Sequence, residues 1–294
     1  MNILDQLTQY LFSGLASGAI YALIGLGFAI IYNATGIINF AQGEFVMLGG
    51  MFSFFLLQSA KLPLALAIIG AILLTTLLGL LFERLAIRPL KSASPLNLVI
   101  ITIGGSILIR GLAMLVWGKD THALPSFSGS DPIELAGASL LPQHLWIVAI
   151  TVIVIVVSKL FFSCTISGKA MRACSYNSRA ASLIGIGVRR MVLLSFVISS
   201  AMGSMAGIII APLTMTSYDV GIMLGLKGFC AAIIGGMSSG ISTVLGGLIL
   251  GVLESLGAGL ISSGYKDAIA FVILLLLLFI RPQGLFKRAE TERV

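Results

Sequence analysis

Long apolar segments alternate with short polar connections along the whole chain. Most apolar runs are continuous and about 20 residues long, which is the length that an α-helix needs to cross the hydrocarbon core of a bilayer. Such runs differ from the ten-residue blocks of alternating polarity that are typical of a transmembrane barrel. The pattern predicts about nine helical segments, at residues 11–32, 37–57, 62–82, 96–117, 144–163, 190–211, 225–238, 241–261 and 267–281.

Two of these segments differ from the others. Segment 37–57 has a polar first half, and segment 225–238 is short and rich in glycine. If either one enters and leaves the membrane on the same side, the number of spans falls to about eight. We therefore expect an all-α polytopic membrane protein, a bundle of about eight or nine transmembrane helices with some broken or re-entrant, in a single domain over residues 1–294.

Composition supports this prediction, and the positions of the basic residues predict how the chain is oriented across the membrane. Only 10% of the residues are charged, against about 25% in a typical soluble domain. Of 18 lysines and arginines, three lie in 83–92, six in 159–190 and four in 281–294. Basic connections of membrane proteins face the cytoplasm, so the net charge of +7 indicates topology and not binding to nucleic acid. Nine spans place the N-terminus outside, and eight place it inside.

The basic segment 164–190 interrupts the apolar pattern. Lys169, Arg172, Tyr176 and Arg179 recur at helical spacing on one face. The opposite face holds small or apolar residues: Ala170, Ala173, Cys174, Ala181 and Ile184. We expect one short helix that Ser167 caps and that stops at the two following glycines, Gly185 and Gly187. It either docks its small-residue face into a partner, or rests its basic face on anionic lipid.

Two acidic residues fall within apolar segments. A carboxylate near the middle of a bilayer costs roughly 2.5–3.5 kcal/mol on insertion scales, so Glu44 and Glu254 should face protein or a wet cavity. Glu44 ends a polar stretch that also contains Asn33, Asn39 and Gln42. These side chains either line a translocation path or bind neighbouring backbone groups and hold the bundle together. Both interpretations remain open at this point.

Helical spacing also relates polar and small residues on other segments. Thr102, Ser106 and Arg110 form a polar stripe on segment 96–117, where Arg110 either lines a cavity or, as the simpler expectation, extends outward to the interface. Small residues form two further stripes, which would allow close contact between helix backbones. These are Gly14, Gly18, Ala22, Gly25 and Ala29 on the first segment, and Gly247, Gly251 and Ala258 beside Glu254.

Motifs of catalysis and cofactor binding are scarce. The chain has no nucleotide-binding G-x-x-x-x-G-K-[ST] motif, and its three cysteines form no C-x-x-C pair, so we expect no cofactor, metal site or disulfide. Residues 236–240 match G-x-S-x-G around Ser238. The two histidines, His122 and His144, belong to outer connections, so we interpret the match as a turn and the protein as non-catalytic.

Four stretches carry a resemblance to a known family. They are GLASGAIYALIGLGFAIIYNATGIINFAQGEFVMLGG (14–50), GKAMRACSYNSRAASLIGI (168–186), GLKGFCAAIIGGMSSGISTVLGGLILGVLESL (225–256) and YKDAIAFVILLLLLFIRPQGLF (265–286). In this order they resemble the branched-chain amino acid ABC transporter permease family of the LivH type. The sequence departs from it at Gln42, where many relatives carry histidine, which bears on pore polarity or substrate choice.

This resemblance implies a multi-pass permease subunit of an ATP-driven importer in the bacterial inner membrane, for branched-chain or related amino acids. The implied partners are a second permease subunit, two cytoplasmic ATPase subunits and a periplasmic substrate-binding protein. Residues 168–186 would be the cytoplasmic coupling region. Its residues for contact with the ATPase are Gly168, Lys169, Arg172, Arg179, Ala181, Leu183 and Gly185.

An alternative from a different class is an ion-coupled secondary transporter or channel that uses Glu44 and Glu254 as proton or sodium sites. It would need no ATPase. For either class, the polar residues of the apolar segments are the candidates for the translocation path: Asn33, Asn39, Gln42, Glu44, Ser106, Arg110 and Glu254.

Overall fold

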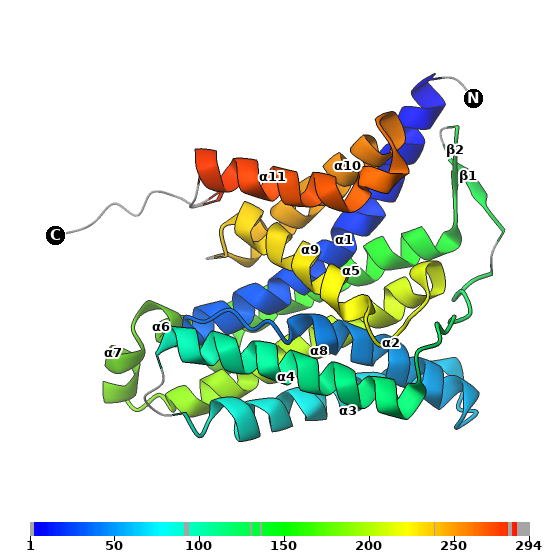
Figure 1. The fold of residues 1–294 in the computed structure, drawn as a ribbon. Helices are drawn as coiled ribbons and strands as arrows, with labels where there is room; N and C mark the ends of the chain where they lie inside the picture. Colours follow the sequence, from blue (N-terminus) through cyan, green and yellow to red (C-terminus); the bar gives the residue numbers. More distant parts are fainter. Residues whose placement is uncertain are drawn as a thin grey trace.

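Every predicted apolar segment corresponds to a helix (Figure 1). The computed structural model describes residues 3–90, 94–129, 131–135, 137–237, 239–281 and 284–286. Within these residues the long helices are α1 (Ile3–Thr35), α2 (Gln42–Gln58), α3 (Leu64–Phe82), α4 (Pro95–Trp117), α5 (Pro142–Cys164), α8 (Val188–Thr214), α9 (Val220–Gly235), α10 (Gly240–Leu260) and α11 (Lys266–Ile280).

Shorter elements connect the long helices. They are the π-helix η1 (Glu83–Ile87), α6 (Ile166–Tyr176), α7 (Ser178–Leu183), the 3₁₀ turn η2 (Ser263–Tyr265), and the strands β1 (Ile133–Leu135) and β2 (Ala138–Leu140). The two strands form an antiparallel hairpin in which Ile133 pairs with Leu140. The hairpin lies in the connection between α4 and α5.

The predicted all-α polytopic membrane fold is confirmed. Seven helices in the described part of the chain are long and apolar enough to cross a membrane. The two other long helices, α2 with 17 residues and α9 with 16, are shorter. At 1.5 Å per residue they reach about 25 Å, less than the roughly 30 Å of a hydrocarbon core. They are the two segments whose composition set them apart in the sequence.

Helix α1 is the centre of the bundle and contacts α5, α8, α9 and α10. In its most apolar 18-residue window 89% of the residues are buried, against 22% in α3, 17% in α5 and 11% in α4 and α11. The outer helices therefore expose leucine, isoleucine and valine side chains over most of their length. Such a surface is stable in lipid and not in water.

The two predicted small-residue stripes are the two sides of one helix contact, between α1 and α10. A Cβ atom added to Gly18 would lie 2.8 Å from the Cα of Leu248, and one added to Gly247 would lie 2.6 Å from the backbone nitrogen of Ala22. Neither distance is sterically possible, so glycine at these positions allows the two backbones to touch.

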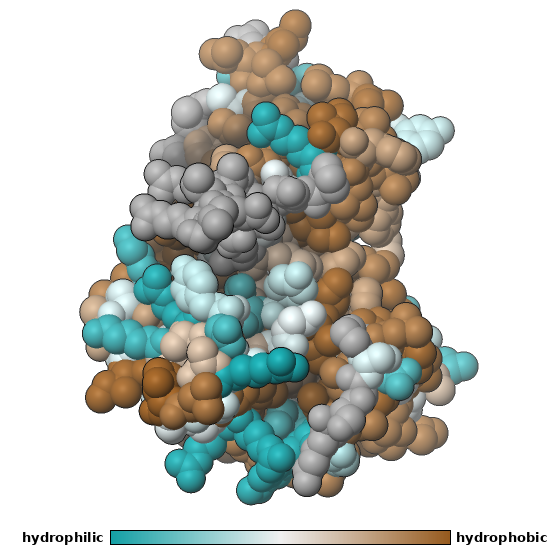
Figure 2. All heavy atoms as spheres, turned by 90° about the vertical axis from the view of Figure 1, so that its left-hand side faces the viewer, coloured by the Kyte–Doolittle hydropathy of each residue, from teal (hydrophilic) through white to brown (hydrophobic). Residues whose placement is uncertain are grey.

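The basic connections lie together at one end of the bundle. The end with α6, α7 and the end of α11 is on the left of Figure 1, and the beginning of α1 is at the opposite end. Figure 2 looks onto the left end and shows hydrophilic side chains gathered over its lower part. The exposed basic residues there include Arg84, Arg88, Arg189 and Arg190. By the positive-inside rule we expect this end to face the cytoplasm and the beginning of α1 to face outward.

Some of the predicted basic residues lie outside the described residues. These are Lys91 in the connection before α4 and the last three basic residues of the C-terminal tail. The basic residues that are described still identify the same end as the basic one, because α6, α7 and the beginning of α8 all lie there (Figure 1).

Candidate functional site

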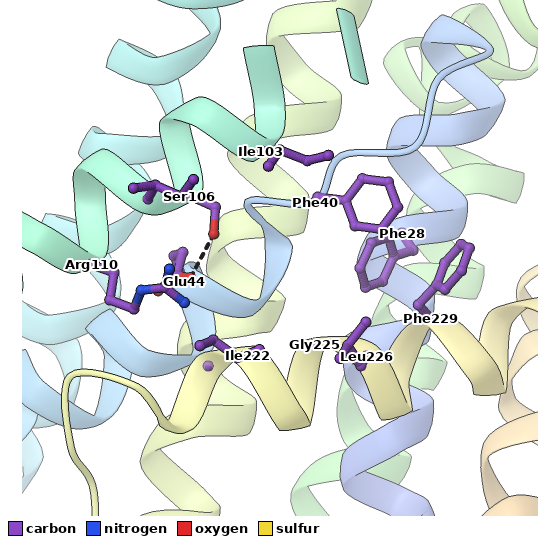
Figure 3. A pocket seen from close by; sticks show the side chains of 12 residues that line it. Phe28, Phe40, Glu44, Ile103, Ser106, Arg110, Ile222, Gly225, Leu226 and Phe229 are labelled. Carbon is purple, nitrogen blue, oxygen red and sulfur yellow. Dashed lines mark hydrogen bonds between the residues drawn. The ribbon is translucent and has the colours of Figure 1, made fainter. Parts of the chain in front are cut away.

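A groove of about 250 Å³ lies between α4 and α9. These two helices form its walls, and Phe28 of α1, Phe40 of the following connection and Glu44 of α2 complete the lining. The groove is open on one side and combines charged with aromatic residues (Figure 3). It is therefore the place where predicted path residues from distant segments meet.

The polar end of the groove is built on Glu44. This residue lies in the first turn of α2, where the helix dipole favours a negative charge, and it is only 1% exposed. The Ser106 hydroxyl donates a hydrogen bond of 2.7 Å to Glu44 Oε1, while Glu44 Oε2 has no hydrogen-bond partner among the described residues. Arg110 lies one turn after Ser106 on α4 and extends beside Glu44 (Figure 3).

Three predicted path residues, Glu44, Ser106 and Arg110, thus line one groove. The simpler expectation for Arg110, that it extends outward to the interface, is wrong, because its side chain lines the groove. The polar stripe on α4 has a second contact in Thr102, whose Oγ1 accepts a hydrogen bond of 3.2 Å from the backbone N–H of Phe40. The stripe therefore faces the connection before α2 over two turns.

The other end of the groove is aromatic. The ring centroids of Phe28 and Phe229 are 5.7 Å apart, and those of Phe40 and Phe229 are 5.6 Å apart. Figure 3 shows these three rings at the end of the groove away from Glu44 and Arg110. The groove therefore has one charged end and one apolar end.

Glycine brings the two short helices together beside the groove. A Cβ atom on Gly225 of α9 would lie 2.9 Å from the Cα of Gly43 in α2. Any larger residue at position 225 would push α9 away from the beginning of α2, because a Cβ atom cannot approach that closely. The short length of both helices and their glycines thus place Glu44 at the wall of the groove.

Three other predicted path residues bind neighbouring backbone or hydroxyl groups outside the groove. Gln42 Nε2 donates to the backbone carbonyl of Ser199 at 3.1 Å, and Gln42 Oε1 accepts from the Ser199 hydroxyl at 2.6 Å. Asn33 Nδ2 donates to the carbonyl of Met237 at 3.0 Å. Asn39 Oδ1 accepts from the backbone N–H of Ala41 at 3.2 Å. The bonds of Gln42 and Asn33 join distant segments and match the interpretation that these residues hold the bundle together, whereas the bond of Asn39 is local.

Glu254 lies apart from the groove and forms an ion pair that was not predicted from the sequence. Lys227 Nζ of α9 lies 2.9 Å from Glu254 Oε1, and both side chains are buried. The Tyr21 hydroxyl donates to the same oxygen at 3.1 Å, and Asp267 lies 2.6 Å from Lys227. A lone lysine inside an apolar segment was the available signal, since such a cation needs an acidic partner.

The basic segment contains two helices rather than the one predicted. Asn177 has an extended backbone (φ −157°, ψ 99°) and ends α6. Its side chain accepts a hydrogen bond of 2.9 Å from the N–H of Ala180 and so begins α7. Thr165, not Ser167, caps α6 by accepting from the N–H of Gly168 at 3.0 Å. The predicted stop after α7 is confirmed, because Gly185 adopts φ +87°.

The predicted small-residue face does not form one docking surface, because Ala170 and Ala173 are half-buried, Ile184 is exposed, and Cys174 and Ala181 are buried within the protein. The docking prediction is therefore wrong for Cys174 and Ala181. Gly168, Met171 and Cys174 of α6, and Ala181 of α7, are buried against the bundle, and this burial raises the pKa of the Cys174 thiol. The surface of the two helices that faces away from the bundle is free for contact. Its exposed residues are Lys169, Arg172, Tyr176, Arg179, Leu183 and Ile184.

The G-x-S-x-G match centres on Ser238, which lies outside the described residues. Gly236 before it has a left-handed backbone with φ +94° and ends α9. His122 and His144 lie near the end of α4 and the beginning of α5, at the opposite end of the bundle (Figure 1). No histidine base therefore approaches this segment from those two positions.

Comparison with known proteins gives the family. Residues 10–278 match the family model described as branched-chain amino acid transport system / permease component. The chain belongs to this permease family. It is 35% identical over 302 residues to the high-affinity branched-chain amino acid transport system permease protein LivH of Salmonella typhimurium, with 97% of both chains covered. It is 33% identical over 299 residues to BraD of Pseudomonas aeruginosa, again with 97% of both covered.

The predicted membership of the branched-chain amino acid permease family is thereby confirmed. A solved structure, PsaBC from Streptococcus pneumoniae in complex with Fab, aligns with a TM-score of 0.45 at 16% identity, covering 95% of this chain and 91% of that one. The chain belongs to a family of transport permeases, and seven helices in its described part are long and apolar enough to cross a membrane, so it is a multi-pass membrane transport protein.

Proposed function

We propose that this chain is a permease subunit of an ATP-driven ABC importer for branched-chain or related amino acids in the bacterial inner membrane. The similarity to LivH and BraD over 97% of the chain carries this proposal. Two cytoplasmic ATPase subunits supply the energy, a periplasmic binding protein delivers the substrate, and a second permease subunit completes the path.

The open groove supports the pairing with a second permease. Helix α4 forms one of its walls and is among the least buried helices of the bundle. Only 11% of the residues in its most apolar 18-residue window are buried. Ionisable residues in membrane proteins face protein or water, since exposure to lipid tails is costly. A second permease that covers the groove keeps the half-buried Arg110 away from lipid, so the translocation path runs between the two subunits along this groove.

The α6–α7 surface is the proposed contact with the ATPases. Its candidates are the buried Gly168 and Ala181 and the terminal Gly185, which shape the two helices, and the exposed Lys169, Arg172, Arg179 and Leu183, which touch the partner. Helix α6 packs against α1, α5 and α8. Helix α8 in turn forms a hydrogen bond with α2, between Ser199 and Gln42. A displacement of α6 can therefore reach the helix that carries Glu44 through direct contacts.

The coupling role is tested by charge reversal. In the double variant Arg172→Glu/Arg179→Glu, we expect the ATPase subunits to be lost on co-purification and leucine uptake by cells to fall at least tenfold. The matched control is Lys61→Glu/Lys119→Glu, which reverses two exposed lysines at the opposite end and should retain the ATPases. Retention of the ATPases and of uptake by the arginine variant would reject the coupling role.

The ion-coupled alternative makes a different prediction. Its two proposed acids lie in different places, and Glu254 already pairs with Lys227, which weighs against a cation site there. The full chain in liposomes, without ATPases, should move no leucine under a proton or sodium gradient. Gradient-driven uptake by the chain alone would establish the alternative and overturn the importer.

A further inference from the structure

The groove has three features that correspond to the three parts of an α-amino acid. We propose that it holds the passing substrate as a zwitterion, with the ammonium group on Glu44, the carboxylate on Arg110 and an apolar side chain against the aromatic end. This inference deepens the proposed function and rests on it. It assigns a chemical role to residues that the family membership leaves unassigned.

Glu44 offers an acceptor for the ammonium group. Its Oε1 already binds Ser106, while its buried Oε2 has no partner, although buried polar atoms nearly always have one. No lysine or arginine among the described residues lies within ion-pair distance of Glu44, in contrast to Glu254. An ammonium group brings a positive charge and three N–H donors, and so it can satisfy the free oxygen.

Arg110 offers the matching donor for a carboxylate. Its guanidinium forms no ion pair with any described residue, and it extends into the groove beside Glu44 (Figure 3). A guanidinium binds a carboxylate through two parallel N–H···O bonds. An acid and a base thus share one end of the groove without a direct ion pair. A ligand that carries both charges can bridge them.

The aromatic end of the groove favours a substrate with an apolar side chain. Phe28, Phe40 and Phe229 provide ring faces, and the groove has no further charged residue among those that line it. An aliphatic side chain gains from burial there, whereas a charged one loses its hydration without a partner. The volume of about 250 Å³ is just below the roughly 300–1,000 Å³ of pockets for drug-sized ligands, which suits a single amino acid.

Binding in a transport path must be weak enough to release the substrate. The test therefore measures weak binding, by saturation-transfer difference NMR on the full chain in lipid nanodiscs. The ligands are leucine, isocaproate, which lacks the ammonium group, and leucinol, which lacks the carboxylate. The wild-type chain should prefer leucine to each analogue by about tenfold or more, as expected for one charge-assisted bond.

Two variants test the contributions of Glu44 and Arg110 separately. Glu44→Gln should lose the preference over isocaproate and keep the preference over leucinol. Arg110→Gln should do the reverse, and because Arg110 is half-buried, this variant stays informative if the first one fails to fold. The control is Glu83→Gln, which removes another buried carboxylate with a free oxygen outside the groove and should keep both preferences.

The outcomes distinguish this inference from the proposed function. Equal binding of leucine and both analogues by the wild-type chain, or unchanged preferences in both groove variants, overturns the zwitterion site. Leucine uptake by cells in that case leaves the importer intact. Preferences that shift as expected support the site, and absent uptake in cells would then count against the importer alone.

Discussion

The Lys227–Glu254 ion pair shows how two charged residues can be accommodated in an apolar interior. The two groups lie on adjacent helices, α9 and α10, with 2.9 Å between them, and Tyr21 adds a hydrogen bond. Removal of one partner from a buried pair leaves an uncompensated charge, which is far more costly than the loss of an exposed pair. Stability should therefore depend strongly on Lys227.

We expect Lys227→Met to lower the free energy of unfolding by about 3–5 kcal/mol, because Glu254 would keep only the more distant Lys266 as a cation. Lys266→Met is the matched control. That lysine is 47% exposed and 3.6 Å from Glu254, so its loss should cost at most about 1 kcal/mol. Thermal unfolding in detergent measures both, and equal melting temperatures for the two variants would contradict the role of the pair.

At the scale of the element, helix contacts in this bundle depend on glycine as much as on large apolar side chains. The α1–α10 contact brings backbone against backbone at Gly18 and Gly247. On the outer helix α4, in contrast, a Cβ atom on Gly104 would have no atom within 4 Å. The same substitution should therefore destabilise the protein at Gly247 and have little effect at Gly104.

We expect Gly247→Val to separate α1 from α10 and to destabilise the protein by about 1–3 kcal/mol or more, as overpacking does elsewhere. Gly104→Val should stay within about 0.5 kcal/mol of the wild-type chain, because its side chain extends into open space. Thermal unfolding and the yield of monodisperse protein check both variants. A Gly247→Val chain as stable as Gly104→Val would show that the contact tolerates a wider helix spacing.

At the scale of the whole molecule, the long helices run between a basic end and an opposite end that holds the N-terminus (Figure 1). Orientation across the membrane decides whether α6 and α7 can meet cytoplasmic subunits. Cys164 can report this orientation, because it is exposed at the end of α5, while Cys174 and Cys230 are buried.

We expect a membrane-impermeant maleimide to label Cys164 in inside-out vesicles and not in right-side-out vesicles. Cys174 should react slowly in both, since burial raises the pKa of its thiol and leaves less of the reactive thiolate. The control is Lys61→Cys at the opposite end, which should show the reverse sidedness. Labelling of Cys164 from outside would invert the topology and exclude the proposed ATPase contact.

The amino-acid sequence by itself determined the long helices, the class of fold and the family. Apolar length and charge placement are local properties, so they identified the nine helical segments and the basic end. Helical spacing likewise identified the faces that carry Ser106, Arg110 and Gly247 before their partners were known. Local patterns of this kind can be predicted from the sequence, because each depends only on residues that are neighbours along one helix.

Only the tertiary structure decided which faces meet. Ser106 and Glu44 are 62 positions apart, and Lys227 and Glu254 are 27 apart, so their pairing follows from the packing of separate helices. The break at Asn177 depends on a side chain that bonds the backbone in competition with helical geometry. Burial then left the basic surface of α6 and α7 outward, because their small residues fit against the bundle and the charges do not.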